Sequence, residues 1–129
     1  MIIVYYVSSN SSCRKAVEWL EEKKLSFVVR RVTKKSPISS FELKKILALT
    51  SNGFEDLYNS KSSQFLNFTA SFDDYSTNQM IDLIITHPFI MKFPIIMDEK
   101  KLLVGFNEDD IRVFFSREQK KRLLRLIDC

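Results

Sequence analysis

The stretch IIVYYVSSNSSCRKAVEWLEEKKLSFVVRRV, residues 2–32, decides the fold. It opens with a continuous run of β-branched and aromatic side chains, which is typical of a strand buried on both faces. A polar stretch follows, and from Cys13 apolar residues recur at helical spacing, with Asn10 or Ser11 as the natural N-cap. Residues 27–32 predict a second strand. Because strand–helix–strand units cross over with one hand, the two strands are expected to lie parallel in one sheet.

The composition excludes several classes of protein. The chain has 129 residues, 45% of them hydrophobic and 28% charged, which is ordinary for one soluble domain with a core. No apolar stretch approaches the roughly 20 residues of a membrane span, and residues 1–7 have no features of a secretion signal. A single histidine excludes a histidine-rich metal site. We therefore expect a cytoplasmic protein without membrane contact, metal or other cofactor, and its net charge of +4 is compatible with an acidic partner.

The middle of the chain predicts helices without strands. Capping boxes at residues 39–42 and 76–79 each open an amphipathic helix. Gly53 is expected to end the first helix in a left-handed C′ conformation, and short helical pieces are expected at residues 54–58 and 62–68. Residues 36–86 are therefore interpreted as a helical insert.

Strands return after the insert. Residues 93–97 and 102–105 predict a β-hairpin with a charged turn between them, and a last helix is expected to start at Asn107 and to bury Ile111, Phe114 and Phe115. The predicted fold is α/β: a thioredoxin-like, four-stranded mixed sheet with an inserted helical lobe. It forms a single domain over residues 1–129, with the core at about residues 1–35 and 87–129.

The order of motifs resembles the Spx/arsenate-reductase (ArsC-like) family, and within it the Spx branch of bacterial transcriptional regulators. Each motif is weak by itself, but together they stand in family order at family spacing. The matching pieces are CRKA (13–16), WLEE (19–22), FELKKIL (41–47) with Thr50 and Gly53, His87-Pro88, PIIMDEK (94–100) and VGFNEDDIR (104–112).

This resemblance implies a regulator that binds the C-terminal domain of the RNA polymerase α subunit and alters transcription under stress. The surface used in the family includes the loop after the second helix, which is Thr50, Asn52 and Gly53 here. An arginine of that helix aligns with Ala48, so part of the usual contact set is missing. The expected consequence is a change in affinity and not in partner.

The resemblance also identifies a missing redox switch. Spx proteins typically carry Cys-x-x-Cys at the start of the first helix, and these four positions read NSSC here, from Asn10 to Cys13. An intramolecular disulfide between them cannot form, because Asn10 has no sulfur.

Residues that the resemblance implies for arsenate reduction are also replaced in this chain. The first position of that motif holds the nucleophilic thiolate in the enzymes, and Asn10 cannot replace it. Two oxyanion-binding arginines align with Lys61, which keeps the charge without the guanidinium fork, and with Phe93, which keeps neither. Pro94 matches the family's cis-proline, although a trans proline at the start of an edge strand is the alternative. No catalytic residue is therefore assigned, and the chain is not expected to be an enzyme.

Cys13 is the remaining candidate for redox sensing. A helix N-terminus and the neighbouring Arg14 and Lys15 would lower the pKa of its thiol, which favours a single-thiol sensor. The alternative is a residue that packs quietly under the first helix. Cys129 could be a distant partner, but a chance terminal cysteine is the simpler interpretation.

The basic tail, residues 117–127, could contact promoter phosphates or an acidic face of the polymerase, or be an ordinary solvated helix. No recognition motif for reading DNA sequence is present, and we expect a monomer when the protein is free. The preferred interpretation is an Spx-like regulator of transcription that lacks the CxxC switch. The alternative is an ArsC-like thiol oxidoreductase that uses Cys13 with glutathione or thioredoxin.

Overall fold

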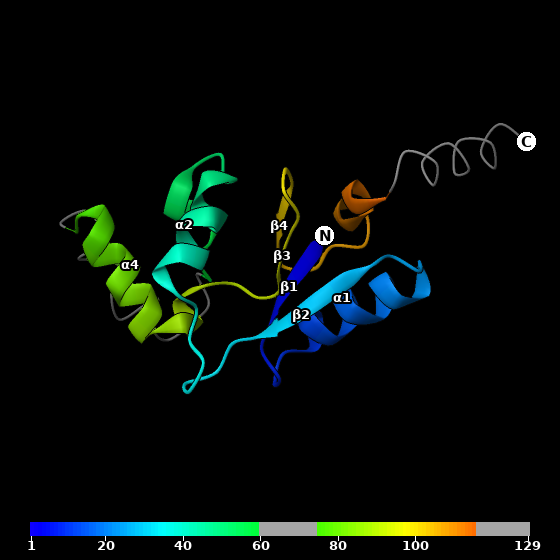
Figure 1. Cartoon of the computed structure of the whole chain (residues 1–129), viewed down its shortest axis with the longest axis horizontal. Coiled ribbons are helices and arrows are strands. Elements are labelled where there is room, and N and C mark those ends of the chain that lie inside the picture. The colour runs from blue at the N-terminus through cyan, green and yellow to red at the C-terminus, as the bar shows by residue number, and fades with distance from the viewer. Residues whose placement is uncertain (60–74, 116–129) are drawn as a thin grey trace, which may run out of the picture.

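The computed structural model describes residues 1–59 and 75–115, and in them a four-stranded sheet lies between two layers of helices (Figure 1). The strand order is β2-β1-β3-β4. The elements are β1 (Ile2–Tyr6), α1 (Ser11–Glu22), β2 (Phe27–Arg31), α2 (Ser40–Ala48), α4 (Thr77–Thr86), β3 (Ile95–Met97) and β4 (Leu102–Val104), with 3-10 helices η1 (Gly53–Asp56), η3 (Pro88–Ile90) and η4 (Asp110–Phe114). The mixed α/β fold predicted from the sequence is confirmed.

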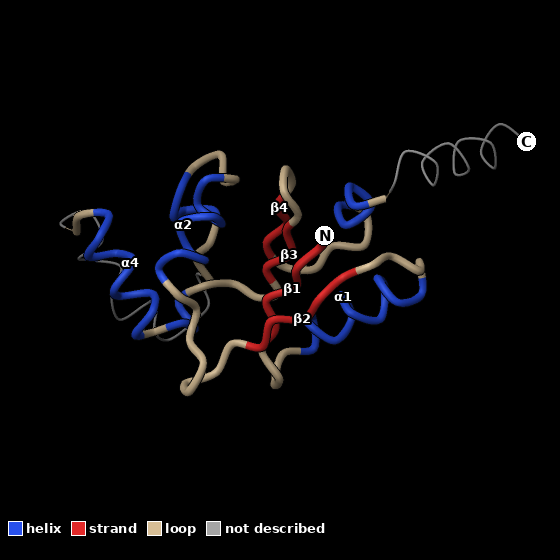
Figure 2. The backbone as a smooth tube through the Cα atoms, in the orientation of Figure 1, coloured by secondary structure: helices blue, strands red, loops and turns tan. Residues whose placement is uncertain are grey.

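Strand β1 is one of the two inner strands of the sheet, which Figure 2 shows in red. It pairs in parallel with β2, from Ile2 opposite Phe27 to Tyr6 opposite Arg31, as the crossover rule predicts. On its other side it pairs antiparallel with β3, which continues into β4 as the predicted hairpin. The β1–β2 pairing therefore follows from the opening residues, and the β3–β4 pairing follows from the charged turn.

Side chains of the sheet alternate between two cores, one on each face. Ile2 and Val4 of β1 belong to the core under α1 and η4, whereas Tyr5 belongs to the core under α2 and α4. The first core contains Ile2, Val4, Ala16, Trp19, Leu20, Ile96, Ile111, Phe114 and Phe115. The second contains Tyr5, Val7, Cys13, Val32, Ile38, Leu43, Ile46, Leu57, Ile81, Ile84, Met91, Phe93, Ile95 and Met97.

The caps predicted for the starts of α1, α2 and α4 are confirmed. The Asn10 side chain caps α1 by accepting from the backbone N–H of Cys13. Ser39 and Ser76 each form a complete capping box, the first with Glu42 at the start of α2 and the second with Gln79 at the start of α4.

The expected role of Gly53 is wrong in one respect. It does adopt a left-handed backbone, with φ of +65°. However, α2 already ends at Ala48 with Leu49 as its C-cap, and Gly53 opens η1 instead of closing α2. The side chain of Thr50 donates a hydrogen bond of 2.7 Å to the carbonyl of Leu47, so a terminal carbonyl of α2 is satisfied before the chain reaches Gly53.

The last described element is a 3-10 helix, η4, and not the α-helix expected from Asn107 onward. Asn107 accepts hydrogen bonds from the backbone N–H groups of Asp109 and Asp110 before η4 begins. Ile111 and Phe114 are three residues apart, so a helix with three residues per turn places both on the sheet. Phe115 follows and packs on Trp19 with ring centroids 5.1 Å apart. The expected helical piece at residues 62–68, the tail at 117–127, Lys61 and Cys129 lie outside the described residues.

A half-buried ion pair fixes α2 against the edge of the sheet. Arg30 of β2 donates from Nε and from a terminal guanidinium nitrogen to the two carboxylate oxygens of Glu42, both at 3.1 Å. The guanidinium also donates to the carbonyls of Ser36 and Pro37, at 3.1 and 2.8 Å. Arg30 thus holds the β2–α2 connection and the first turn of α2 at once.

The charge of Glu42 stabilises this arrangement. Burial raises the pKa of its carboxyl, but the hydrogen bonds from Arg30 and from the backbone and hydroxyl of Ser39, with the Arg30 charge, outweigh burial and hold the pKa below its usual value. A carboxyl with a lowered folded-state pKa adds stability above its ordinary pKa, and this stability is lost as pH falls through the lowered value.

We predict that Glu42→Gln lowers the free energy of unfolding at pH 7 by about 1–3 kcal/mol, because it removes a charged acceptor from a half-buried guanidinium. The difference from the parent protein should shrink at an acidic pH below the lowered pKa of Glu42, because protonation there removes the charge of its carboxyl. Urea unfolding at both pH values measures this. Glu55→Gln, at an exposed site in η1, is the matched control and should change little. Equal stability of the Glu42 and Glu55 variants at pH 7 would contradict the prediction.

Candidate functional site

The first candidate site lies where β1 passes into α1. The side-chain oxygen of Asn10 accepts from the N–H of Cys13 at 3.1 Å, and its amide nitrogen donates to the carbonyl of Phe93 at 3.4 Å. Asn10 therefore connects the start of α1 with the loop that precedes β3. Asn10, at the position where the resemblance expects a thiol, acts here as a structural bridge.

Cys13 is fully buried, with no exposed surface. It belongs to the core on the α2 side of the sheet, and the backbone N–H of Val7 donates to its sulfur at 3.5 Å. Burial raises the pKa of the thiol, and the opposing effects of the Val7 N–H and the Arg14 charge are smaller. The expected lowering of this pKa is therefore wrong, because the residues around the sulfur exclude water and disfavour the thiolate.

Phe93 and Pro94 complete this region. The peptide bond between them is cis, as predicted. Phe93 is only 5% exposed and packs into the same core as Cys13. An apolar ring therefore occupies the position that the resemblance assigns to an oxyanion-binding arginine.

A pocket of about 470 Å³ opens beside these residues. Its lining residues are Val7, Ser9, Asn10, Ser12, Asn59, Phe89, Met91, Lys92 and Phe93. Cys13 does not line it, so the pocket presents hydroxyl, amide and ammonium groups but no thiol. None of its lining residues is a histidine or carboxylate that could activate a serine as a nucleophile.

The second candidate site is the loop after α2, and it does not line that pocket. Asp56 organises this loop: one carboxylate oxygen accepts from the backbone N–H groups of Ser51 and Asn52, both at 2.9 Å, and the other accepts from the Asn52 side chain. The Asn52 N–H contributes most to holding the pKa of Asp56 below its usual range. Gly53 follows with open space where a Cβ would be.

Several features of these regions have no signal in the sequence. Ser9, Ser12 and Lys92 line the pocket beside Asn10, and Arg30 positions α2, but no motif marks any of them. Their importance depends on contacts between segments far apart in the chain. In the described ranges, 1–59 and 75–115, there is no cluster of three or more histidine, cysteine or carboxylate side chains suited to a metal ion. Within the same ranges, no helix has the length and apolar character needed to cross a membrane.

Burial makes the reactivity of Cys13 testable. We predict that the native protein reacts with a disulfide reagent such as DTNB at least about tenfold more slowly than free cysteine, because the thiol is covered and its thiolate is disfavoured. A Cys129→Ser background ensures that the assay reads Cys13 alone. The rate should rise to that of free cysteine in urea. A native rate as fast as that of free cysteine would instead favour Cys13 as an exposed sensor.

Comparison with known proteins places this geometry in a family. A protein of Streptococcus pyogenes named global transcriptional regulator Spx is 39% identical over 125 residues, which cover 97% of this chain and 92% of that protein. An Spx regulator of Bacillus cereus is 39% identical over 117 residues, covering 91% and 88% of the two chains.

A solved structure shares the fold. The arsenate reductase of Vibrio cholerae matches with a TM-score of 0.71 and 18% identity, over 88% of this chain and 97% of that one. At this identity the likeness supports the fold and not the activity. The model of the ArsC family matches residues 5–114, from the end of β1 through η4. The chain therefore belongs to the ArsC family.

Proposed function

We propose that this protein is a cytoplasmic regulator of transcription of the Spx type, which docks on the C-terminal domain of the RNA polymerase α subunit. The observation that carries the proposal is the 39% identity over 97% of the chain to a protein named as a global transcriptional regulator. The arrangement around Asn10 supports it, because a regulator needs no nucleophile in the pocket beside α1. A disulfide between positions 10 and 13 cannot control this regulator, because Asn10 has no thiol.

The proposed docking surface is the loop with Thr50, Asn52 and Gly53. The backbone of this loop is organised by Asp56, and Asn52 is exposed. A Cβ built on Gly53 meets no atom within 4 Å, so a side chain there would project away from this chain. A bulky residue at Gly53 should therefore obstruct a partner and not the fold.

This property gives a sharp test. Gly53→Arg should weaken binding to the isolated α C-terminal domain by at least about tenfold, because the arginine would occupy the interface. Gly53→Ala is the matched control: it imposes the same left-handed backbone on a residue with a Cβ, at about 1 kcal/mol, but adds almost no bulk. Calorimetry with the purified full-length proteins measures both affinities. Absence of binding by the parent protein, or equal binding by the Gly53→Arg and Gly53→Ala variants, would refute the docking proposal.

The remaining finer features belong to the same proposal. The protein acts as a monomer before it meets the polymerase. Basic residues of the segment 117–127 contact promoter phosphates within the complex without reading base sequence. Stress is transmitted by the amount of protein or by a signal other than an internal disulfide, and Cys13 reacts only when the core around it opens.

The alternative is a thiol oxidoreductase related to arsenate reductases, one of which has a similar fold. It fits less well, because Asn10 replaces the nucleophilic position, Phe93 fills an oxyanion position, and the remaining thiol of Cys13 is buried. We predict no glutathione- or thioredoxin-dependent arsenate reduction above the rate of a protein-free mixture. A turnover that disappears in Cys13→Ser would establish the enzyme and overturn this prediction.

A further inference from the structure

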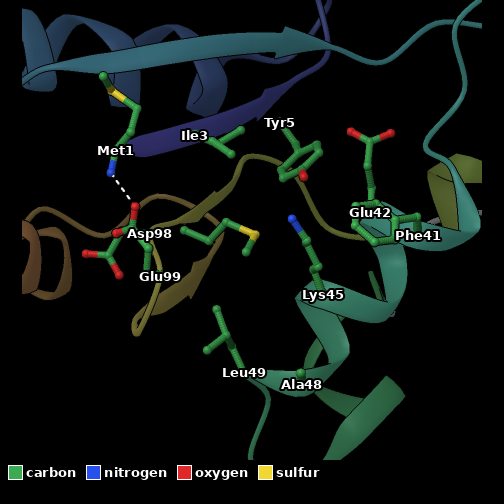
Figure 3. Close-up of a pocket in the computed structure, with 11 residues that line it drawn as sticks. Met1, Ile3, Tyr5, Phe41, Glu42, Lys45, Ala48, Leu49, Asp98 and Glu99 are labelled. Carbon is green, nitrogen blue, oxygen red and sulfur yellow. Dashed lines mark hydrogen bonds and ion pairs between the residues drawn. The ribbon is translucent and has the colours of Figure 1, made fainter.

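A second concave surface lies on the α2 side of the sheet and belongs to neither candidate site. It is a groove of about 580 Å³ between β1, the β3–β4 turn and α2 (Figure 3). Its lining residues are Met1, Ile3, Tyr5, Phe41, Glu42, Lys45, Ala48, Leu49, Met97, Asp98 and Glu99. Most of this lining is apolar.

Tyr5 brings an unsatisfied donor into the groove. Its side chain is only 3% exposed, and its hydroxyl has no hydrogen-bond partner in the described part of the chain. Burial, assisted by the charge of Glu42 and opposed by that of Arg30, raises the pKa of the phenol. The hydroxyl therefore keeps its proton at neutral pH and can donate a hydrogen bond to a ligand. A buried hydroxyl without a partner is costly, so an acceptor supplied by a ligand would be favourable.

Lys45 faces Tyr5 from the opposite wall. Figure 3 shows the ammonium of Lys45, on α2, and the hydroxyl of Tyr5, on β1, pointing toward each other across the groove. No carboxylate of the described residues pairs with Lys45, whose ammonium lies over the ring of Phe41 at 4.6 Å from its centre.

The acidic groups of the rim, in contrast, are already occupied. Glu42 is paired with Arg30, and Glu99 accepts from the N-terminal ammonium at 2.6 Å. One carboxylate oxygen of Asp98 accepts from two backbone N–H groups in the hairpin turn. The groove therefore offers two unmatched donors, from Tyr5 and Lys45, and each acid among its lining residues already has a partner. A complementary ligand must supply an acceptor, and an anionic one satisfies both donors.

The dimensions favour a small molecule over a macromolecule. The pair between Met1 and Glu99 lies at one end of the groove, and Phe41 with Lys45 lies at the other (Figure 3). The volume of the open groove, about 580 Å³, falls within the range of roughly 300–1,000 Å³ that is usual for small-molecule pockets. Apolar surface for the rest of the ligand comes from Ile3, Met97 and Leu49.

We propose that this groove binds a carboxylic acid with an aliphatic body, held by its carboxylate between Tyr5 and Lys45 and by its chain against Ile3, Leu49 and Met97. This is a small-molecule site on the same helix that leads to the Thr50–Gly53 loop. It does not depend on the proposed docking of the polymerase.

Titration of the full-length protein with sodium decanoate, below its micelle concentration, tests the proposal. Calorimetry should give saturable one-to-one binding. Decanol should bind about tenfold or more weakly, because it lacks the charge that strengthens the bonds to Lys45 and Tyr5. Decylamine should not bind, because it brings a third donor beside two others.

Variants locate the site. Tyr5→Phe should weaken decanoate binding about two- to tenfold and Lys45→Gln about tenfold. Ala48→Trp should abolish it, because Ala48 is exposed on the groove wall and a large ring would fill the space. Lys44→Gln is the matched control: Lys44 is exposed on the same helix, does not line the groove, and should leave affinity unchanged.

Each possible result either supports or overturns the proposed site. Amide shifts in NMR spectra confined to the lining residues, together with the loss in Lys45→Gln, would support the site. Absence of saturable decanoate binding would overturn the proposal. Equal binding of decylamine, or unchanged affinity in Lys45→Gln and Ala48→Trp variants whose thermal unfolding is cooperative, would overturn it as well.

Discussion

The position of β1 inside the sheet, between β2 and β3, is the constraint on which the rest of the structure depends. The strand pairs in parallel with β2 on one side and antiparallel with β3 on the other, so both halves of the chain must return to it. Its side chains alternate between two cores, with Val4 under α1 and Tyr5 under α2. A shift of this strand by one residue would turn the side chains of each core toward the opposite face of the sheet, and neither core could then pack as it does.

The loop after β1 is held in place by the polar side chain of Asn10. Asn10 caps α1 and reaches the carbonyl of Phe93, so the start of the first helix and the loop before β3 are in contact. The sulfur of Cys13 lies in an apolar core, where desolvation outweighs the nearby charge of Arg14 and disfavours the thiolate.

Helix α2 connects the surfaces on which the proposals rest. Its first turn is held by Arg30, its side forms the wall of the groove with Lys45 and Ala48, and its C-terminal end leads to the loop at Gly53. Apolar packing of Leu43 and Ile46 fixes the helix on the sheet. The polar clamp at Arg30 then limits how far its first turn can move relative to β2, because the guanidinium bonds Glu42 in that turn and the carbonyls of Ser36 and Pro37 at the same time.

The sequence by itself determined the order of elements, the parallel pairing of β1 with β2 and the capping boxes of α2 and α4, because each depends on residues close together in the chain or on the chirality of the crossover. Through its resemblance to a family it also predicted that Asn10 stands where relatives carry a thiol, and that Pro94 follows a cis peptide bond, which the structure contains. Only the tertiary structure decided the state of Cys13, since the charges beside it in sequence favour a thiolate while the core around it in space does not. The same reason applies to the groove: Tyr5 and Lys45 are far apart in the chain, and only the packing of α2 on the sheet brings their polar ends together.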